Sequence, residues 1–245
     1  AADIMIWSHR LDDALTLAQT AFDAAQREGD WHNVMNALDG LADANARAGN
    51  WDAALDYFRQ WFELWAMIGG IDASARSGDV AAILASRGEL DEARDRVEVA
   101  TATTGRSPIE EIHLHSKACH AMVCAAEWGA AITHGQTARH VAAQIGYGDV
   151  GAAPFRTDLV EALLQVGATD EANEVAEEHH RFAERSGFPR GRADAARSQA
   201  LVAAGRGDVD RAVGLLERAA ELHRAAGVPL ELGRDLLVLG STLRR

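Results

Sequence analysis

Apolar side chains recur three and four residues apart along almost the whole chain, and glycines separate the runs. Between Trp31 and Ala48, for example, Val34, Leu38 and Leu41 fall on one side of a helix. The spacing predicts helix pairs at 31–68, 71–104, 108–145, 153–186 and 190–226. It also predicts a leading helix at 4–28, interrupted near Ser8, and a final helix at 230–245.

A short phrase recurs about every 40 residues: a small residue, any residue, a bulky residue, a polar residue, any residue and alanine. Clear copies begin at Gly49, Gly88 and Gly207, weaker ones at Ala126 and Gly167, and a partial one at His9. Such a period is typical of stacked units that bury their apolar sides against their neighbours. We therefore predict one all-α domain over residues 1–245, a right-handed superhelix of about five antiparallel helix pairs plus a leading and a trailing helix.

The helix ends carry their own signals. Gly49 follows a predicted first helix, as a left-handed C-terminal cap does, and Gly146 follows a predicted second helix. Ser107 and Pro108 read as an N-cap and a first-turn proline. The partial phrase at the start and the unpaired last helix lead us to expect a piece of a longer array.

The repeated unit resembles the tetratricopeptide repeat. Ala42, Asn45, Gly49, Trp51, Ala54 and Phe58 match that family's slots in the first full pair, and Ala200, Ala203, Gly207, Val209, Ala212 and Leu216 do so in the last. The family period is about 34 residues, so the units here are longer. The middle unit departs further, with Ala126 at the turn glycine and Gly135 at the aromatic position of the second helix.

The last repeats also look like the sensor repeats of large ATP-binding bacterial transcription regulators of the LuxR/MalT type. The stretches that carry this likeness are 195–204, 207–208, 215–219 and 233–240. In that family such repeats receive an inducer or a partner protein. The chain has no Gly-x-x-x-x-Gly-Lys-Ser/Thr phosphate loop and no DNA-binding segment after Leu243. The resemblance therefore implies the sensor part of such a regulator.

Composition narrows the classes of partner. Alanine supplies about a fifth of the residues, as in helical proteins. The net charge of −13 argues against direct binding of nucleic acid. The only cysteines, Cys119 and Cys124, are poorly placed to form a disulfide bond, which fits a reducing compartment. The sequence also shows no signal-peptide pattern and no long apolar span. We therefore expect a cytoplasmic protein without a membrane segment.

The tetratricopeptide resemblance implies that the first helices line a concave groove for a protein, a peptide or a small effector. The groove residues carried over are Asn36, Asp39, Asp43, Arg47, His113, Ser116, His120, Thr157, Glu161, Gln165, Asp194 and Arg197. An ordinary solvated helix face is the competing interpretation. The dense aromatic set in the second helix of the first pair predicts a further exposed contact at Tyr57, Phe62 and Trp65, although packing between helices explains most of that set.

Catalytic and metal signals are weak. His113 and His120 share a helix face but lie about 10 Å apart, which is too far for one ion, so no metal or other cofactor is predicted. There is no Gly-x-Ser-x-Gly or His-Glu-x-x-His motif. We therefore predict a binding protein and no enzyme, with a stand-alone interaction scaffold and a helical-repeat enzyme as alternatives. Unpartnered leucines of the last helix, such as Leu236 and Leu237, point to docking on another chain, including a homo-oligomer.

Overall fold

The computed structural model describes residues 11–70, 73–148 and 154–244, and within these ranges it contains helices and no strand. The helices are α2 (Leu11–Glu28), α3 (Trp31–Ala48), α4 (Trp51–Met67), α5 (Ser74–Arg87), α6 (Leu90–Ala102), α7 (Pro108–Cys124), α8 (Trp128–Ile145), α9 (Phe155–Gln165), α10 (Thr169–Ser186), α11 (Pro189–Gly205), α12 (Val209–Ala226) and α13 (Pro229–Thr242). The predicted all-α solenoid of helix pairs is confirmed. The part of the leading helix predicted before Leu11 lies outside the described residues.

The predicted helix ends are present with their expected geometry. Gly49 ends α3 with a φ of 84°, and Gly146 ends α8 in the same left-handed region. Ser107 caps α7 in a complete capping box with Glu110. Ala126 takes the left-handed position at the α7–α8 turn with a φ of 55°, where the matching turns have glycine.

Small residues let the helices approach one another closely. Ala54, Ala81, Ala118 and Ala131 are buried in the largest apolar cluster, which runs from α3 to α9. Gly135 of α8 stands where the family resemblance expects an aromatic ring. A Cβ at this position would lie 3.0 Å from Leu159 of α9, so α9 fills the space that a large side chain would need.

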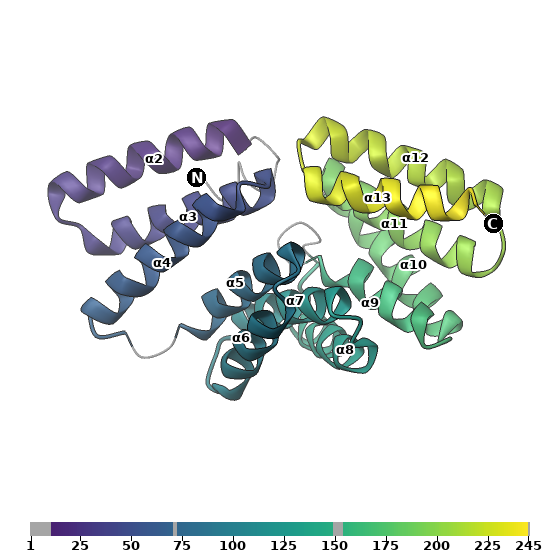
Figure 1. Cartoon of the computed structure of the whole chain (residues 1–245), viewed down its shortest axis with the longest axis horizontal. Coiled ribbons are helices and arrows are strands. Elements are labelled where there is room, and N and C mark those ends of the chain that lie inside the picture. The colour runs from purple at the N-terminus through teal and green to yellow at the C-terminus, as the bar shows by residue number, and fades with distance from the viewer. Residues whose placement is uncertain (1–10, 71–72, 149–153, 245) are drawn as a thin grey trace.

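The array bends until its two ends meet (Figure 1). A small apolar cluster joins α2 and α3 to the α12–α13 turn, and we call it the closing contact; it consists of Leu11, Ala14, Ala44, Ala226 and Val228. A Cβ on Gly49 would lie 3.1 Å from Pro229, so the chain segments touch here as well. The helix pairs therefore form a closed ring in place of an open arc.

The last helix is bound mainly through polar groups. Asp235 and Thr242 are its buried residues, whereas Leu236 and Leu237 are 46% and 74% exposed. The side of α13 that faces the array is thus charged, and a leucine side faces outward. The polar side brings α13 into the site described next.

Candidate functional site

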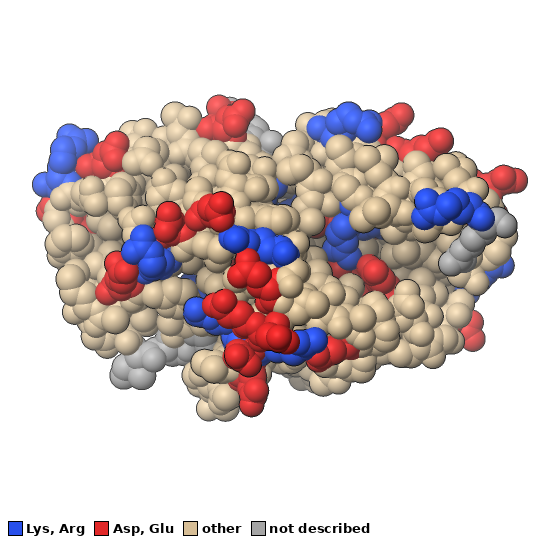
Figure 2. Space-filling model, in the orientation of Figure 1, with Lys and Arg blue, Asp and Glu red and all other residues tan. Residues whose placement is uncertain are grey.

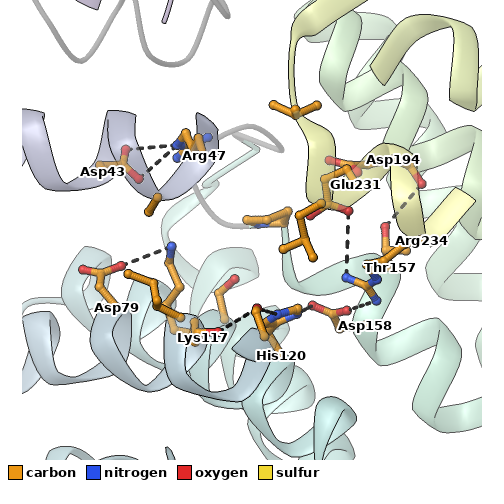
Figure 3. A pocket seen from close by; sticks show the side chains of 18 of the residues that line it. Asp43, Arg47, Asp79, Lys117, His120, Thr157, Asp158, Asp194, Glu231 and Arg234 are labelled. Atoms are coloured by element: carbon orange, nitrogen blue, oxygen red, sulfur yellow. Dashed lines mark hydrogen bonds and ion pairs between the residues drawn. The ribbon is translucent and has the colours of Figure 1, made fainter. Parts of the chain in front are cut away.

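The first helices of all the pairs, together with α13, enclose a central pocket in the ring (Figure 3). Its volume is about 110 Å³, roughly ten times the space that one water requires. Apolar side chains such as Phe58, Ile83 and Leu230 form part of the wall, and charged side chains form much of the rest. The pocket can therefore hold several waters or one small molecule.

The N-terminal wall is a chain of ion pairs. Asp43 accepts hydrogen bonds from Arg47 at 3.0 and 3.1 Å. On the next first helix, Asp79 of α5 pairs with Arg76 at 3.0 Å and with Lys117 of α7 at 3.1 Å. Burial raises the pKa of Asp43, but Arg47, Lys117 and Arg190 outweigh it and lower that pKa to about 2. Asp43 is therefore a carboxylate at neutral pH.

His120 joins three helices on the floor of the pocket. Its Nδ1 lies 3.2 Å from Asp158 of α9, and its Nε2 lies 3.0 Å from the Ser86 hydroxyl of α5. Arg234 of α13 donates to the same Asp158 carboxylate at 2.5 Å. Burial lowers the pKa of His120, but Asp158 more than offsets this effect and the pKa rises to about 10. His120 is therefore a buried cation at neutral pH.

This arrangement has the connectivity of a hydroxyl nucleophile, an imidazole base and a carboxylate. A general base must be unprotonated at the working pH, and the pKa of His120 lies far above neutrality. The Ser86 hydroxyl also donates to the Ala82 carbonyl at 2.8 Å, so its proton is directed away from the imidazole. The three residues therefore act as a positioning network and not as an activated nucleophile.

The C-terminal wall is a buried network centred on Arg197 of α11. Arg197 binds Asp194, Glu231 and Asp235, the first and the last at 3.2 and 3.0 Å. His223 of α12 bridges Asp235 at 2.5 Å and Asp194 at 3.2 Å. Burial lowers the pKa of His223, but its bonds to these two carboxylates raise it above its ordinary value. The network ties α11, α12 and α13 together.

Arg190, at the start of α11, has longer ion-pair distances than Arg197 on the same helix. Its side chain is 8% exposed, and its Nε lies 3.4 Å from Asp194 without making a hydrogen bond. Its Nη2 lies 3.7 Å from Glu231. Both carboxylates already bind Arg197. A buried guanidinium therefore faces the pocket with unmet hydrogen-bonding capacity.

Seven of the twelve carried-over groove residues line the pocket: Asp43, Arg47, Ser116, His120, Thr157, Asp194 and Arg197. The other five lie elsewhere: Asp39 pairs with Arg76, Glu161 with Arg234 and His113 with Tyr147, while Asn36 and Gln165 are exposed. Whether any of the twelve binds a ligand stays a prediction.

Sequence reasoning missed several pocket residues, although a usable signal was present. Asp79 lies 36 residues after Asp43, and Glu231 and Arg234 lie 37 residues after Asp194 and Arg197. The resemblance had been carried over to neither α5 nor α13, so these equivalents were not considered. Arg190 has no such equivalent among the groove positions, because it is the second residue of α11 and precedes them.

Outside the pocket, the described residues include an aromatic cluster on α4 and a histidine pair between α7 and α8. Tyr57, Phe62 and Trp65 are half-buried, and Trp65 stacks on Trp61 with ring centroids 5.4 Å apart. The Nδ1 atoms of His115 and His134 lie 2.9 Å apart. Among the described residues, no group of three or more His, Cys, Asp or Glu side chains is placed to hold a metal ion.

The protonated state of His120 predicts how stability depends on pH. The pKa of histidine is near 6.5 in an unfolded chain and about 10 here, so the native state binds the extra proton between these values. The stabilisation is complete below pH ~6.5 and is lost as the pH rises towards 10. We expect the free energy of unfolding in urea to fall from pH 6.5 to 9.5, less steeply in His120→Gln. Equal slopes in the two proteins would contradict the assignment.

Comparison with known proteins gives the repeat its family context. A tetratricopeptide-repeat family model matches residues 1–67. No curated protein matches the sequence. A structure described as "Crystal structure of BtubC (BKLC) from P. vanneervenii" is 17% identical, covers 96% of this chain and 83% of that chain, and has a TM-score of 0.47. No helix within the described ranges has the length and apolar character needed to cross a membrane.

The match supports the tetratricopeptide resemblance in the N-terminal repeats. Repeats of this family generally mediate interactions between proteins, and helical-repeat folds are typically non-catalytic. The likeness to regulator sensor repeats stays a prediction.

Proposed function

We propose that this chain is a sensor module that captures a small polar effector in the central pocket. The observation that carries the proposal is the enclosure of charged side chains from α3, α5, α7, α9, α11 and α13 by a ring whose ends touch. An open superhelix offers a long groove to an extended peptide. A closed ring with a pocket of about 110 Å³ has room for a small molecule instead.

Capture would be coupled to the shape of the ring. The pocket walls come from both ends of the array, which are joined by the small closing contact. An effector that touches both walls binds the closed form better than an open one and shifts the population towards it. That shift would change the outer surface offered to neighbouring domains or proteins.

The experiment is a thermal-unfolding screen of the full chain against small polar metabolites. A ligand that binds the native state raises Tm in a saturable way. The pocket-filling variant Ala82→Phe should abolish the rise, whereas Ala143→Phe, at an exposed position on α8, should retain it. A ligand effect that survives in Ala82→Phe, or a screen in which nothing stabilises the wild type, would refute the proposal.

The resemblance to LuxR/MalT-type sensor repeats suggests the larger protein to which this module belongs. We place the module as the sensor of a bacterial transcription regulator, on the support of the stretches at 195–204 and 233–240. The full open reading frame tests this setting. A phosphate loop encoded upstream and a helix-turn-helix encoded downstream would support it, and a free-standing gene would contradict it.

A protein-docking scaffold is the second candidate, and the leucine side of α13 favours it. Leu236 and Leu237 are exposed on α13, and Leu243 is exposed at its C-cap. Sedimentation of the wild type and of Leu237→Glu tests docking on a second copy of the chain. Self-association that the substitution abolishes would support this candidate, and a monomer in both samples would remove that form of it.

A further inference from the structure

We propose that the effector carries a compact oxyanion, such as a phosphate or carboxylate group, and that Arg190 of α11 and Lys117 of α7 bind it. The inference rests on the proposed function and names the chemistry of its ligand.

The guanidinium group of Arg190 makes only long ion pairs. A guanidinium offers five N–H donors in a planar fork, yet the ion-pair distances from Arg190 to Asp194 and Glu231 are 3.4 and 3.7 Å. Leaving a buried charged donor without a hydrogen bond is costly. The two oxygens of an oxyanion match the spacing of the guanidinium fork, so such a ligand would form two charge-assisted hydrogen bonds with Arg190.

The two carboxylates nearest to Arg190 also bind a second arginine, although the Asp194 Oδ2 atom that faces Arg190 makes no hydrogen bond. Asp194 is bound by Arg197 and His223, each at 3.2 Å, and Glu231 is bound by Arg197. Both carboxylates therefore lie closer to Arg197 than to Arg190. An oxyanion that approaches Arg190 therefore competes only with ion pairs of 3.4 and 3.7 Å, which are longer than normal hydrogen bonds.

Lys117 of α7 is the second cation that we expect to contact the oxyanion. Its ammonium group can donate three hydrogen bonds, and its ion pair with Asp79 at 3.1 Å uses one of them. Lys117 extends from α7 into the pocket, towards Asp79 and the Asp43–Arg47 pair (Figure 3). Lys117 and Arg190 both lower the pKa of Asp43. The two cations therefore act on the same part of the pocket from different helices.

The charge of the pocket differs in sign from that of the chain. Its lining holds five Arg and Lys side chains and the protonated His120, six cations in all, against five carboxylates. The chain as a whole carries −13, and Figure 2 shows acidic side chains on the outer surface. The pocket lining therefore lacks the acidic excess of the whole chain, which favours an anionic ligand there more than elsewhere on the protein.

The test is calorimetric titration of the full chain with inorganic phosphate, and separately with 1,4-diaminobutane, at constant ionic strength. We expect saturable binding of phosphate and none of the diamine. Arg190→Gln should weaken phosphate binding by about tenfold or more, because a charge-assisted contact is lost. Arg192→Gln, on the same helix but outside the pocket, should bind phosphate as the wild type does.

The variants also separate binding from folding. If Arg190→Gln fails to fold, Arg190→Lys serves in its place, because it keeps the charge and loses the fork; we expect weaker phosphate binding that is still measurable. Absence of phosphate binding, equal binding in Arg190→Gln, or binding of the diamine would overturn the inference. A neutral or cationic ligand from the metabolite screen would leave the proposed function standing, whereas a screen without any ligand would refute both.

Discussion

Replacement of Arg197 by methionine should lower the free energy of unfolding by about 3–5 kcal/mol. Arg197 is buried and binds Asp194, Glu231 and Asp235, so its removal leaves buried carboxylates without their main counter-ion. The cost arises because one partner of a desolvated network is removed while the others stay charged. Urea denaturation followed by circular dichroism measures the change.

The matched control is Arg206→Met. Arg206 is the C-cap of the same helix, its side chain is 47% exposed, and it lies 3.9 Å from Asp170, so its removal should cost less than about 1 kcal/mol. Glu231 and Asp235 lie on α13, so we also expect that helix to be the first part of Arg197→Met to lose protection from hydrogen exchange. Equal destabilisation by the two substitutions would show that the network does not hold the C-terminal wall.

The substitution Val228→Asp should open the ring without unfolding the helices. Val228 is buried in the closing contact and stands at the N-cap of α13, where it makes no side-chain cap bond. Aspartate is a favourable N-cap residue, so α13 should form at least as well as before. A carboxylate in an apolar contact without a partner is costly, so the two ends should separate.

Small-angle X-ray scattering should then show a larger radius of gyration for Val228→Asp, with an unchanged helical circular dichroism signal. Ligands of the pocket should bind this variant more weakly, because its walls no longer face each other. Leu237→Asp adds the same charge at an exposed position of α13 and should leave both properties unchanged. A compact Val228→Asp protein would mean that the closing contact does not hold the ring.

The helices could be predicted from the sequence because their signals are local. The end of α3 is set by Gly49 in the left-handed region, and the start of α7 by the Ser107–Glu110 capping box. The unusual turn at Ala126 was also visible, since alanine replaces the glycine of the other copies. Each of these features depends on a few neighbouring residues.

The closure of the ring could not be predicted in this way. Leu11 and Val228 are far apart in the sequence, and their contact depends on the rotation accumulated over all the repeats between them. Part of the pocket lining could be named from the sequence, because equivalent positions of successive first helices face the same side of the array. His223 was missed because it lies on a second helix, which a groove argument leaves out, although it bridges Asp194 and Asp235.

The ring is closed around its pocket, and a distance measured between its two ends tests this closure. Spin labels at positions 12 and 225, in a Cys124→Ser background, flank the closing contact at exposed sites, while Cys119 is buried. Pulsed electron–electron double resonance should give a single, narrow distribution of distances between the two labels, centred at the short distance expected for a closed ring. A broad distribution, or one centred at a long distance, would mean that the ring is open in solution.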